Sequence, residues 1–118
     1  MNFKKLSGSF RHALAGLGTV FKEEQNFRII VVFGIIVLIL ALFLNIVLWQ
    51  LVILILVIFS LVILELINTV VEKLVDVVHP RLHHYAATIK DIMAGAVLVA
   101  SVVTLLIVFL ILGTHIIQ

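Results

Sequence analysis

Three carboxylates and one amide recur at spacings of three and four residues in the segment LELINTVVEKLVDVV. They are Glu65, Asn68, Glu72 and Asp76. Because an α-helix advances about 100° per residue, these positions fall within an arc of roughly 80° and form one polar stripe on an otherwise aliphatic helix. Burying a single carboxylate in a lipid-facing segment costs on the order of 2.5–3.5 kcal/mol. Because this free-energy cost recurs along one face of the helix, the stripe indicates a binding site. We expect a divalent cation with its ligand to occupy that site.

The charged residues around this stripe supply the parts of a phosphoryl-transfer reaction. Mg²⁺ prefers hard oxygen ligands and usually combines one or two carboxylates with substrate phosphates. A lysine such as Lys90 suits a polyphosphate bridged by the metal. Glu65, flanked by Leu64 and Leu66, lies deepest among the acids and suits a general base that removes a proton from a hydroxyl. Together these residues favour phosphoryl transfer from a metal-bound nucleotide to an alcohol at the bilayer surface.

Several other kinds of site are excluded or disfavoured by the sequence. It contains no phosphate-binding loop of the GxxxxGK[ST] type and no HExxH motif, so nucleotide chemistry must use a helical site of another kind. It contains no cysteine, which excludes disulfides and thiolate metal sites. Glu72 and Asp76, next to Lys73, are also compatible with solvated residues at a helix end. Pro80 argues against a metal site made by the neighbouring histidines His79, His83 and His84.

The composition indicates an all-α membrane protein. The chain has 118 residues, of which 64% are hydrophobic and only 12% charged, whereas soluble domains are about 45–50% apolar. No Asp, Glu, Lys or Arg occurs from Ile29 to Leu64 or from Ile92 to Gln118, and His115 is the one residue of the second run that can gain a charge. A helix needs about 20 residues to cross the hydrocarbon core, so we expect two helices in the first run, separated by a tight turn at Asn45, and one in the second. The expected transmembrane spans are residues 29–44, 47–67 and 92–113.

Residues 3–23 precede these spans and predict an amphipathic helix at the membrane surface. Large apolar residues recur there every three or four positions, a pattern typical of a helix that lies in the headgroup plane; they are Phe3, Leu6, Phe10, Leu14, Leu17 and Phe21. The helix of the second span should continue past Asp76 until Pro80 stops it, and a new helix should begin near Tyr85. No repeat or second domain is evident, so residues 1–118 are expected to form a single membrane-embedded domain.

The distribution of basic residues predicts the orientation in the membrane. The segment before the first span and the loop between the second and third spans carry every Lys and Arg; they are Lys4, Lys5, Arg11, Lys22, Arg28, Lys73, Arg81 and Lys90. By the positive-inside rule, the N-terminus and the acidic stripe are cytoplasmic and the C-terminus lies on the outer side of the membrane. Attraction to anionic headgroups accounts for the net charge of +2, so we expect membrane lipids, and no nucleic acid, as partners.

Three segments resemble the small prokaryotic diacylglycerol kinases. ELINTVVEKLVD (65–76) is similar to the family signature E-x-x-N-x-x-x-E-x-x-x-D, IKDIMAGAVL (89–98) to its A-K-D-x-x-A-G-A-V segment, and EEQNFR (23–28) to its acidic segment before the first span. The resemblance covers essentially the whole chain. It implies a homotrimer of three-helix subunits with active sites between neighbours, which uses ATP and Mg²⁺ to phosphorylate the hydroxyl of a lipid alcohol.

The resemblance also implies roles by position. Glu65 would be the general base, and Glu24 and Glu72 would be the metal ligands. Four residues would contact the nucleotide or support its site, with Lys90 on the phosphates and Asn68 as a neighbouring polar contact; they are Asn68, Asp76, Lys90 and Asp91. Ala87 and Thr88 stand where many family members carry a Gly or a basic residue, which leaves the nucleotide contacts of that loop open.

The identity of the acceptor lipid follows less directly from the sequence than the type of reaction does. The FKEE-x-NF segment and the AGAVLV run resemble the Gram-positive branch of the family, which implies undecaprenol as acceptor, with diacylglycerol as the alternative. We expect an apolar face of the surface helix to line the entrance for the lipid; its residues are Phe10, Leu14, Leu17 and Phe21. A small cation channel or an accessory membrane subunit is a distant alternative. It is disfavoured because the acids lie at the cytoplasmic boundary, where Lys90 would repel cations.

Overall fold

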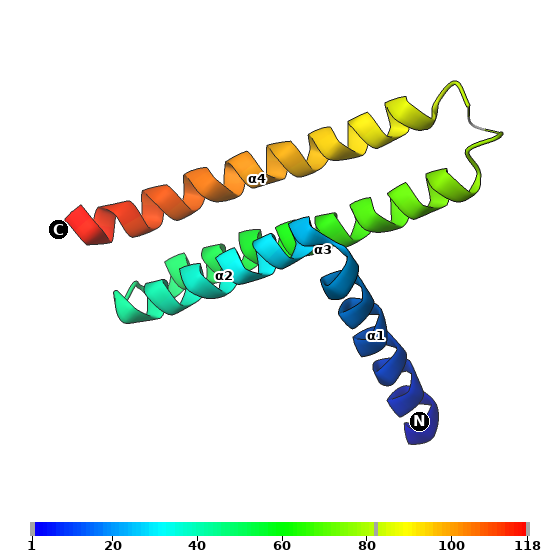
Figure 1. Ribbon diagram of the computed structural model, residues 1–118. Helices are drawn as coiled ribbons and strands as arrows, with labels where there is room; N and C mark the ends of the chain where they lie inside the picture. Colours follow the sequence, from blue (N-terminus) through cyan, green and yellow to red (C-terminus); the bar gives the residue numbers. More distant parts are fainter. Residues whose placement is uncertain (1, 82, 118) are drawn as a thin grey trace.

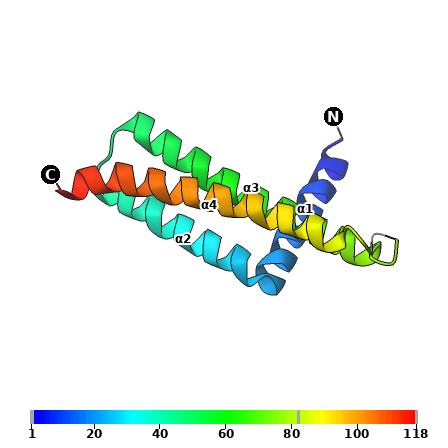
Figure 2. The same cartoon turned by 90° about the horizontal axis from the view of Figure 1, so that it is seen from above.

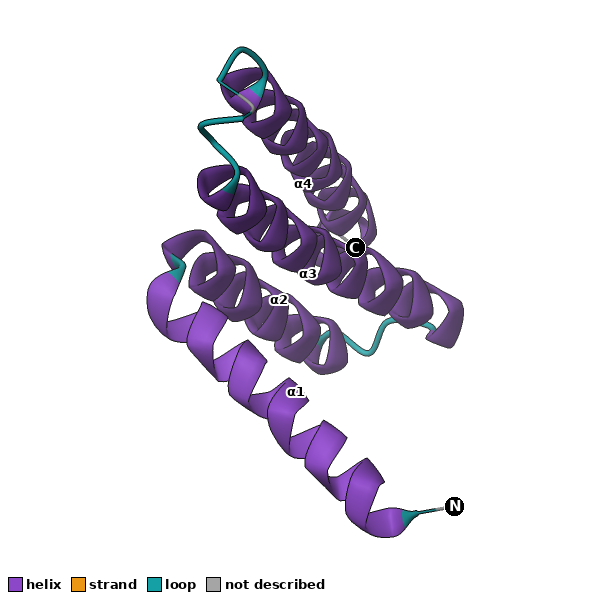
Figure 3. Ribbon diagram, turned by 90° about the vertical axis from the view of Figure 1, so that its right-hand side faces the viewer, coloured by secondary structure: helices purple, strands orange, loops and turns teal. Residues whose placement is uncertain are grey.

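The computed structural model describes residues 2–81 and 83–117, and all of its regular elements are α-helices (Figure 1). In chain order they are α1 (Phe3–Glu23), α2 (Gln25–Phe43), α3 (Leu48–Val77) and α4 (Ala86–Ile117). α3 packs against both α2 and α4. Seen from above, α4 projects between α2 and α3, so the three helices form a triangular bundle (Figure 2). α1 leaves this bundle at a steep angle (Figure 1), and in Figure 3 it lies beyond α2, away from α3 and α4.

Helices α2, α3 and α4 are each long and apolar enough to cross a membrane. The prediction of an all-helical membrane protein is therefore confirmed. Each expected span falls almost entirely within one of these helices, but α3 continues to Val77 and α4 begins at Ala86. Both helices thus extend beyond the apolar runs at the end of the bundle that carries the acids (Figure 1). We call this the acidic end; the α2–α3 turn and the end of α4 lie at the opposite end.

α1 spans the residues expected from the apolar repeat. Asn2 begins the helix, because its side-chain oxygen accepts hydrogen bonds from the backbone N–H groups of Lys4 and Lys5 at 3.1 and 3.2 Å. No residue of α1 is buried within the chain, and its line of large apolar side chains is exposed. Its placement on a membrane surface stays a prediction.

The expected tight turn at Asn45 joins α2 to α3. Asn45 has a φ of 54°, in the left-handed region that Asn and Gly tolerate best. The N–H of Ile46 donates to the carbonyl of Ala41 at 3.4 Å, and the N–H of Asn45 donates to that of Leu42 at 3.2 Å. These two bonds form a Schellman motif, which satisfies the last carbonyls of α2 and reverses the chain within four residues.

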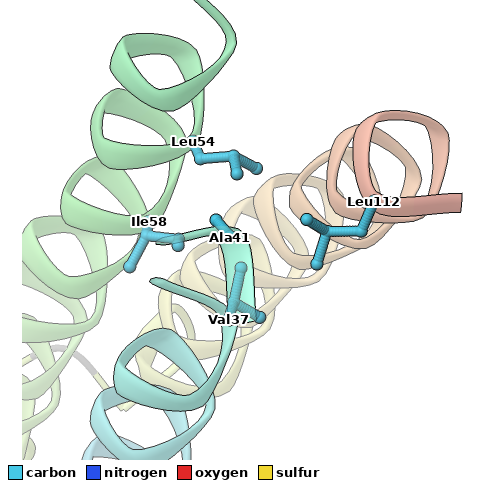
Figure 4. Close-up of a cluster of buried hydrophobic side chains, with 5 residues drawn as sticks. All are labelled: Val37, Ala41, Leu54, Ile58 and Leu112. Carbon is cyan, nitrogen blue, oxygen red and sulfur yellow. The ribbon is translucent and has the colours of Figure 1, made fainter. Parts of the chain in front are cut away.

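The buried core lies toward the opposite end and draws on all three helices of the bundle (Figure 4). Its residues are Val37, Ala41, Leu54, Ile58 and Leu112. At the same end, His115 Nε2 of α4 lies 2.7 Å from Gln50 Oε1 of α3. Small residues let membrane helices approach closely, and Gly34 of α2 lies close against Ile58 of α3. A Cβ atom there would lie 2.7 Å from Ile58 Cγ2.

Gly34→Ala should therefore destabilise the bundle. Ile58 is β-branched and has little freedom to move its methyl group, and overpacking of this kind costs about 1–3 kcal/mol. The free energy of unfolding, measured by denaturant titration in mixed micelles, should fall by that amount. Gly113→Ala is the matched control, because a Cβ atom there meets nothing within 4 Å among the described residues. Equal stability of the two variants would contradict this account of the α2–α3 contact.

Candidate functional site

The first part of the polar stripe of α3 faces the inside of the bundle at the acidic end, whereas Asp76 at its far end is exposed. The side chains of Glu65, Asn68 and Thr69 are buried, with exposed fractions of 2%, 7% and 2%. Thr69 satisfies its hydroxyl locally, because Oγ1 donates to the carbonyl of Glu65 at 3.0 Å. Glu65 Oε2 and Asn68 Oδ1 are buried and have no hydrogen-bond partner within residues 2–81 and 83–117. Leaving a buried polar atom unpaired costs about 1–3 kcal/mol, so these two atoms mark a place where a ligand would be stabilised.

Two further carboxylates lie near Glu65. Glu72, one turn beyond Asn68 on α3, accepts a long hydrogen bond from Asn68 Nδ2 at 3.4 Å. Glu24 stands at the joint between α1 and α2, two residues before Asn26, which lines a cavity together with Glu65. The charges of Glu72 and, more weakly, of Glu24 act on Glu65. Like charges gathered in a poorly solvated place repel each other strongly. The structure thus brings together Glu24, Glu65, Asn68 and Glu72, the four residues that we call the acidic cluster.

The acidic cluster fits Mg²⁺ in one specific way. Within the described ranges, no three His, Asp or Glu side chains gather closely enough to hold a metal ion by themselves. Mg²⁺ does not need such a cage, because it is usually bound through one or two carboxylates and completes its octahedron with water and substrate phosphates. Glu24 and Glu72 offer two half-buried carboxylates, and an unpaired amide oxygen lies beside them on Asn68.

A cavity of about 310 Å³ adjoins Glu65, the one charged residue in its wall. Its other lining residues come from the start of α2 and from α4; they are Asn26, Ile29, Ile30, Ala94, Val97, Leu98 and Ser101. A second cavity of about 210 Å³ shares Ile29, Ile30 and Ser101 with the first and continues along the bundle past Leu61 and Thr104. An apolar path therefore leads from the Glu65 carboxylate along the bundle toward the opposite end.

The sequence did not point to the walls of this cavity. Ala94 and Ser101 belong to a long apolar helix, and the direction in which each faces depends on how α4 packs. The predicted lipid contacts on α1 lie elsewhere, because Phe10 lines a shallow apolar depression on α1 itself, with Phe3 and Leu6. Leu14, Leu17 and Phe21 are exposed on the same helix. None of the four lines the cavity beside Glu65 in the described chain.

The remaining predicted residues form a second polar group, nearer the ends of α3 and α4. Lys90 Nζ makes an ion pair with Asp76 Oδ1, and both side chains are substantially exposed. Asp91 follows at an exposed position of α4. Exposed ion pairs contribute at most about 1 kcal/mol to stability, so Lys90 can exchange Asp76 for another anion at little cost. In the single chain, this group is separate from the acidic cluster by about one turn of α3.

Comparison with known proteins gives a consistent family. The family described as prokaryotic diacylglycerol kinase matches residues 11–112. A diacylglycerol kinase of Synechocystis sp. is 37% identical over 100 residues, which cover 84% of this chain and 57% of the relative. An undecaprenol kinase of Bacillus subtilis is 34% identical over 103 residues, covering 87% and 84%. A diacylglycerol kinase of Helicobacter pylori is 33% identical over 100 residues, covering 85% and 78%.

The chain thus spans little more than half of the Synechocystis relative but most of the other two. The names of these relatives describe kinases that act on lipids, although they differ in the acceptor. The polar stripe of α3, the acidic segment before α2 and the start of α4 all fall within the matched residues. The chain therefore belongs to the prokaryotic diacylglycerol kinase family, a family of membrane lipid kinases.

Proposed function

We propose that this chain transfers the γ-phosphoryl group of ATP to the hydroxyl of a membrane lipid alcohol. The observation that carries the proposal is Glu65, whose carboxylate is 2% exposed, has an unpaired oxygen among the described residues and lies in the wall of a largely apolar cavity. A carboxylate with this placement can meet the one polar group of a lipid. Membership of a kinase family implies ATP as the phosphoryl donor.

Glu65 acts as the general base in this proposal. The acceptor hydroxyl lies in the cavity within hydrogen-bond reach of the carboxylate. As the hydroxyl oxygen forms a bond to the γ-phosphorus, its proton passes to Glu65, and the bond from the γ-phosphorus to the bridging oxygen of ADP breaks. Asn68, one turn along α3, has an unpaired amide oxygen among the described residues and orients the groups that meet there. The apolar walls exclude water, which would otherwise compete with the lipid as acceptor.

In this proposal the phosphates of ATP lie on the side of Glu65 that faces Glu24 and Glu72. Glu24 and Glu72 would hold Mg²⁺, which supplies positive charge to the triphosphate. Lys90 would contact a phosphate by leaving its exposed ion pair with Asp76, while Asp76 and Asp91 support the nucleotide site. Because the two polar groups are separate in one chain, we propose a homotrimer in which a neighbouring subunit brings them together, as the family resemblance implies.

Undecaprenol is the acceptor that we propose, with diacylglycerol as the alternative. The second section of the apolar path beside Glu65 has a volume of about 210 Å³, and a single isoprenoid chain makes a smaller demand on such a path than two acyl chains. The undecaprenol kinase of B. subtilis aligns over 84% of its length, which supports this choice. The exposed face of α1, with Phe10, Leu14, Leu17 and Phe21, would hold the surrounding lipid at the cytoplasmic surface, while the C-terminus lies outside.

Glu65→Gln should leave the protein folded and abolish nearly all turnover. The amide keeps the size and hydrogen-bonding capacity of the side chain but cannot accept the proton, a contribution worth about 10²–10⁴-fold. The measurement is kcat for phosphoryl transfer from ATP to the lipid in mixed micelles. Glu23→Gln is the matched control, because the same chemical change there affects only an exposed ion pair with Lys73. Activity of Glu65→Gln within threefold of the parent would show that Glu65 is not the base.

Glu72→Ala should raise the Mg²⁺ concentration that gives the half-maximal rate, in addition to lowering the rate. Removal of one ligand from a hard-cation site weakens the affinity for the ion directly, whereas a purely structural change would lower the rate at every Mg²⁺ concentration. A Mg²⁺ titration at saturating ATP separates these effects. A half-maximal concentration identical to that of the parent would exclude Glu72 as a ligand.

Mixtures of two inactive variants test the proposed sharing of sites between subunits. If Glu65→Gln and Lys90→Gln remove groups that different subunits contribute to one site, trimers assembled from both variants should contain some intact sites. Unfolding and reassembling the mixture should then restore part of the activity, and each variant reassembled alone should stay inactive. A mixture without activity, or a fully active monomer in native mass spectrometry, would contradict the proposed arrangement.

A further inference from the structure

The joint between α1 and α2 places one residue of the acidic cluster. Glu24 has an extended backbone, with φ −109° and ψ 110°, between two helices, and α1 turns away from the bundle there (Figure 1). Its N–H donates to the carbonyl of Val20 at 2.8 Å, and its own carbonyl accepts from the N–H of Arg28 at 3.3 Å. Glu24 therefore belongs to the backbone hydrogen bonding of both helices.

The Glu24 side chain does not do what an acid at this position usually does. Glu24 stands at the N-cap of α2, where acidic side chains commonly accept hydrogen bonds from the first backbone N–H groups of the helix. The described structure contains no such bond from the Glu24 side chain. Its carboxylate is instead near enough to interact electrostatically with Glu65. The position of the joint, and not a local cap, thus determines where this carboxylate lies.

Arg28 of α2 makes hydrogen bonds to the end of α1 across the joint at Glu24. Its guanidinium Nη1 donates to the carbonyls of Phe21 and Lys22, each at 2.8 Å. The last four carbonyls of an α-helix have no partner within the helix, and a cation at that end is favoured by the helix dipole. Arg28 lies on the first turn of α2 and folds back onto the end of α1, so a rotation of α1 about Glu24 would break both bonds.

Two further contacts lie near the hydrogen bonds of Arg28. Phe27 of α2 is buried and meets Phe21 of α1 edge to face, with ring centroids 6.4 Å apart. Lys73 of α3 makes an ion pair with Glu23 at 3.1 Å, but both side chains are more than half exposed, so this pair contributes little. Arg28 is therefore the polar contact on which the angle between α1 and α2 chiefly depends.

We propose that Arg28 is a positioning residue for phosphoryl transfer, because by binding the carbonyls of Phe21 and Lys22 it holds the Glu24 carboxylate beside Glu65. The inference rests on the proposed function and adds a residue to it that touches neither substrate nor metal. Displacement of a reacting group by about 1 Å can cost on the order of 10²-fold in rate. Lysine at this position keeps the charge but, as a point donor on a flexible stem, should hold the joint less firmly.

The orientation of α1 can be measured without ATP or Mg²⁺. The chain contains no cysteine, so Ser9→Cys on α1 and Ser60→Cys on α3, both exposed, provide two spin-label sites. Labelled subunits diluted with excess unlabelled protein in nanodiscs report the distance between labels within one subunit by pulsed electron paramagnetic resonance. Arg28→Gln should broaden or shift this distance distribution, and Arg28→Lys should give an intermediate result. Lys22→Gln, which removes a nearby exposed charge but keeps the backbone carbonyl, should match the parent.

Mg²⁺ titrations of the same variants connect the joint to the reaction. Arg28→Gln should raise the Mg²⁺ concentration for the half-maximal rate and lower kcat by about tenfold or more, with substantial recovery in Arg28→Lys. The proposal is overturned if Arg28→Gln leaves the distance distribution unchanged, or changes it without altering the Mg²⁺ titration. If Arg28→Gln does not assemble, Arg28→Lys takes its place. A distance distribution or a Mg²⁺ titration of Arg28→Lys equal to that of Lys22→Gln would then overturn the proposal.

Glu24→Gln distinguishes failure of this inference from failure of the proposed function. If Glu24→Gln alters the Mg²⁺ titration but Arg28→Gln leaves the helix angle unchanged, only the role of Arg28 is refuted. If Arg28→Gln changes the angle but Glu24→Gln leaves the titration unchanged, the metal role of Glu24 is refuted, and with it the reason for positioning that residue.

Discussion

Burial of Glu65 among apolar helices is the constraint on which the rest of the arrangement depends. A carboxylate that is 2% exposed in a chain of this hydropathy is costly, and one of its oxygens is unpaired among the described residues. Hydrogen bonds within residues 2–81 and 83–117 leave that oxygen uncompensated. A ligand that brings a hydroxyl, with a cation nearby, would offset this cost. The buried carboxylate of Glu65 that destabilises the site is therefore the same group that would take part in the proposed reaction.

The stability needed to tolerate such a site comes from the other end of the bundle. Val37, Ala41, Leu54, Ile58 and Leu112 bring α2, α3 and α4 together there (Figure 4). The Schellman turn at Asn45 and the close approach at Gly34 set the register of α2 against α3. Because the core and the acidic cluster occupy opposite ends, the helices can enclose cavities beside Glu65 without loss of their closest packing. Separation of the core from the acidic cluster explains how one small bundle contains both a closely packed core and a costly buried carboxylate.

Much of the fold could be predicted from the sequence, because it depends on local signals. The apolar runs gave the three membrane-crossing helices, Asn45 indicated the turn, and Pro80 explained why α3 ends at Val77. The polar stripe on α3 followed from helical periodicity alone. The family resemblance supplied the roles of Glu24, Lys90 and Asp91, which stay predictions, as do the trimer, the orientation in the membrane and the placement of α1 on its surface.

The features that could not be predicted depend on contacts between distant segments. The cavity wall combines Ile29 and Ile30 of α2 with Ala94 and Ser101 of α4, and periodicity cannot say which faces of two uniformly apolar helices meet. The pairing of Lys90 with Asp76 depends on the loop between α3 and α4. Arg28 was identified only as one of the basic residues that set the topology. Its bonds to the end of α1 depend on the angle at Glu24, which no local pattern specifies.

The measurement that tests the central claim most directly is transfer of labelled γ-phosphate from ATP to a lipid alcohol by the purified protein in mixed micelles. Undecaprenol and diacylglycerol should be compared at equal mole fraction, with Mg²⁺ present or removed by chelation. We expect labelled undecaprenyl phosphate, a higher kcat/KM for undecaprenol than for diacylglycerol, and no product without the divalent cation. A preference of tenfold or more for diacylglycerol would overturn the proposed acceptor alone. Absence of labelled product with both lipids would contradict the assignment of this chain as a lipid kinase.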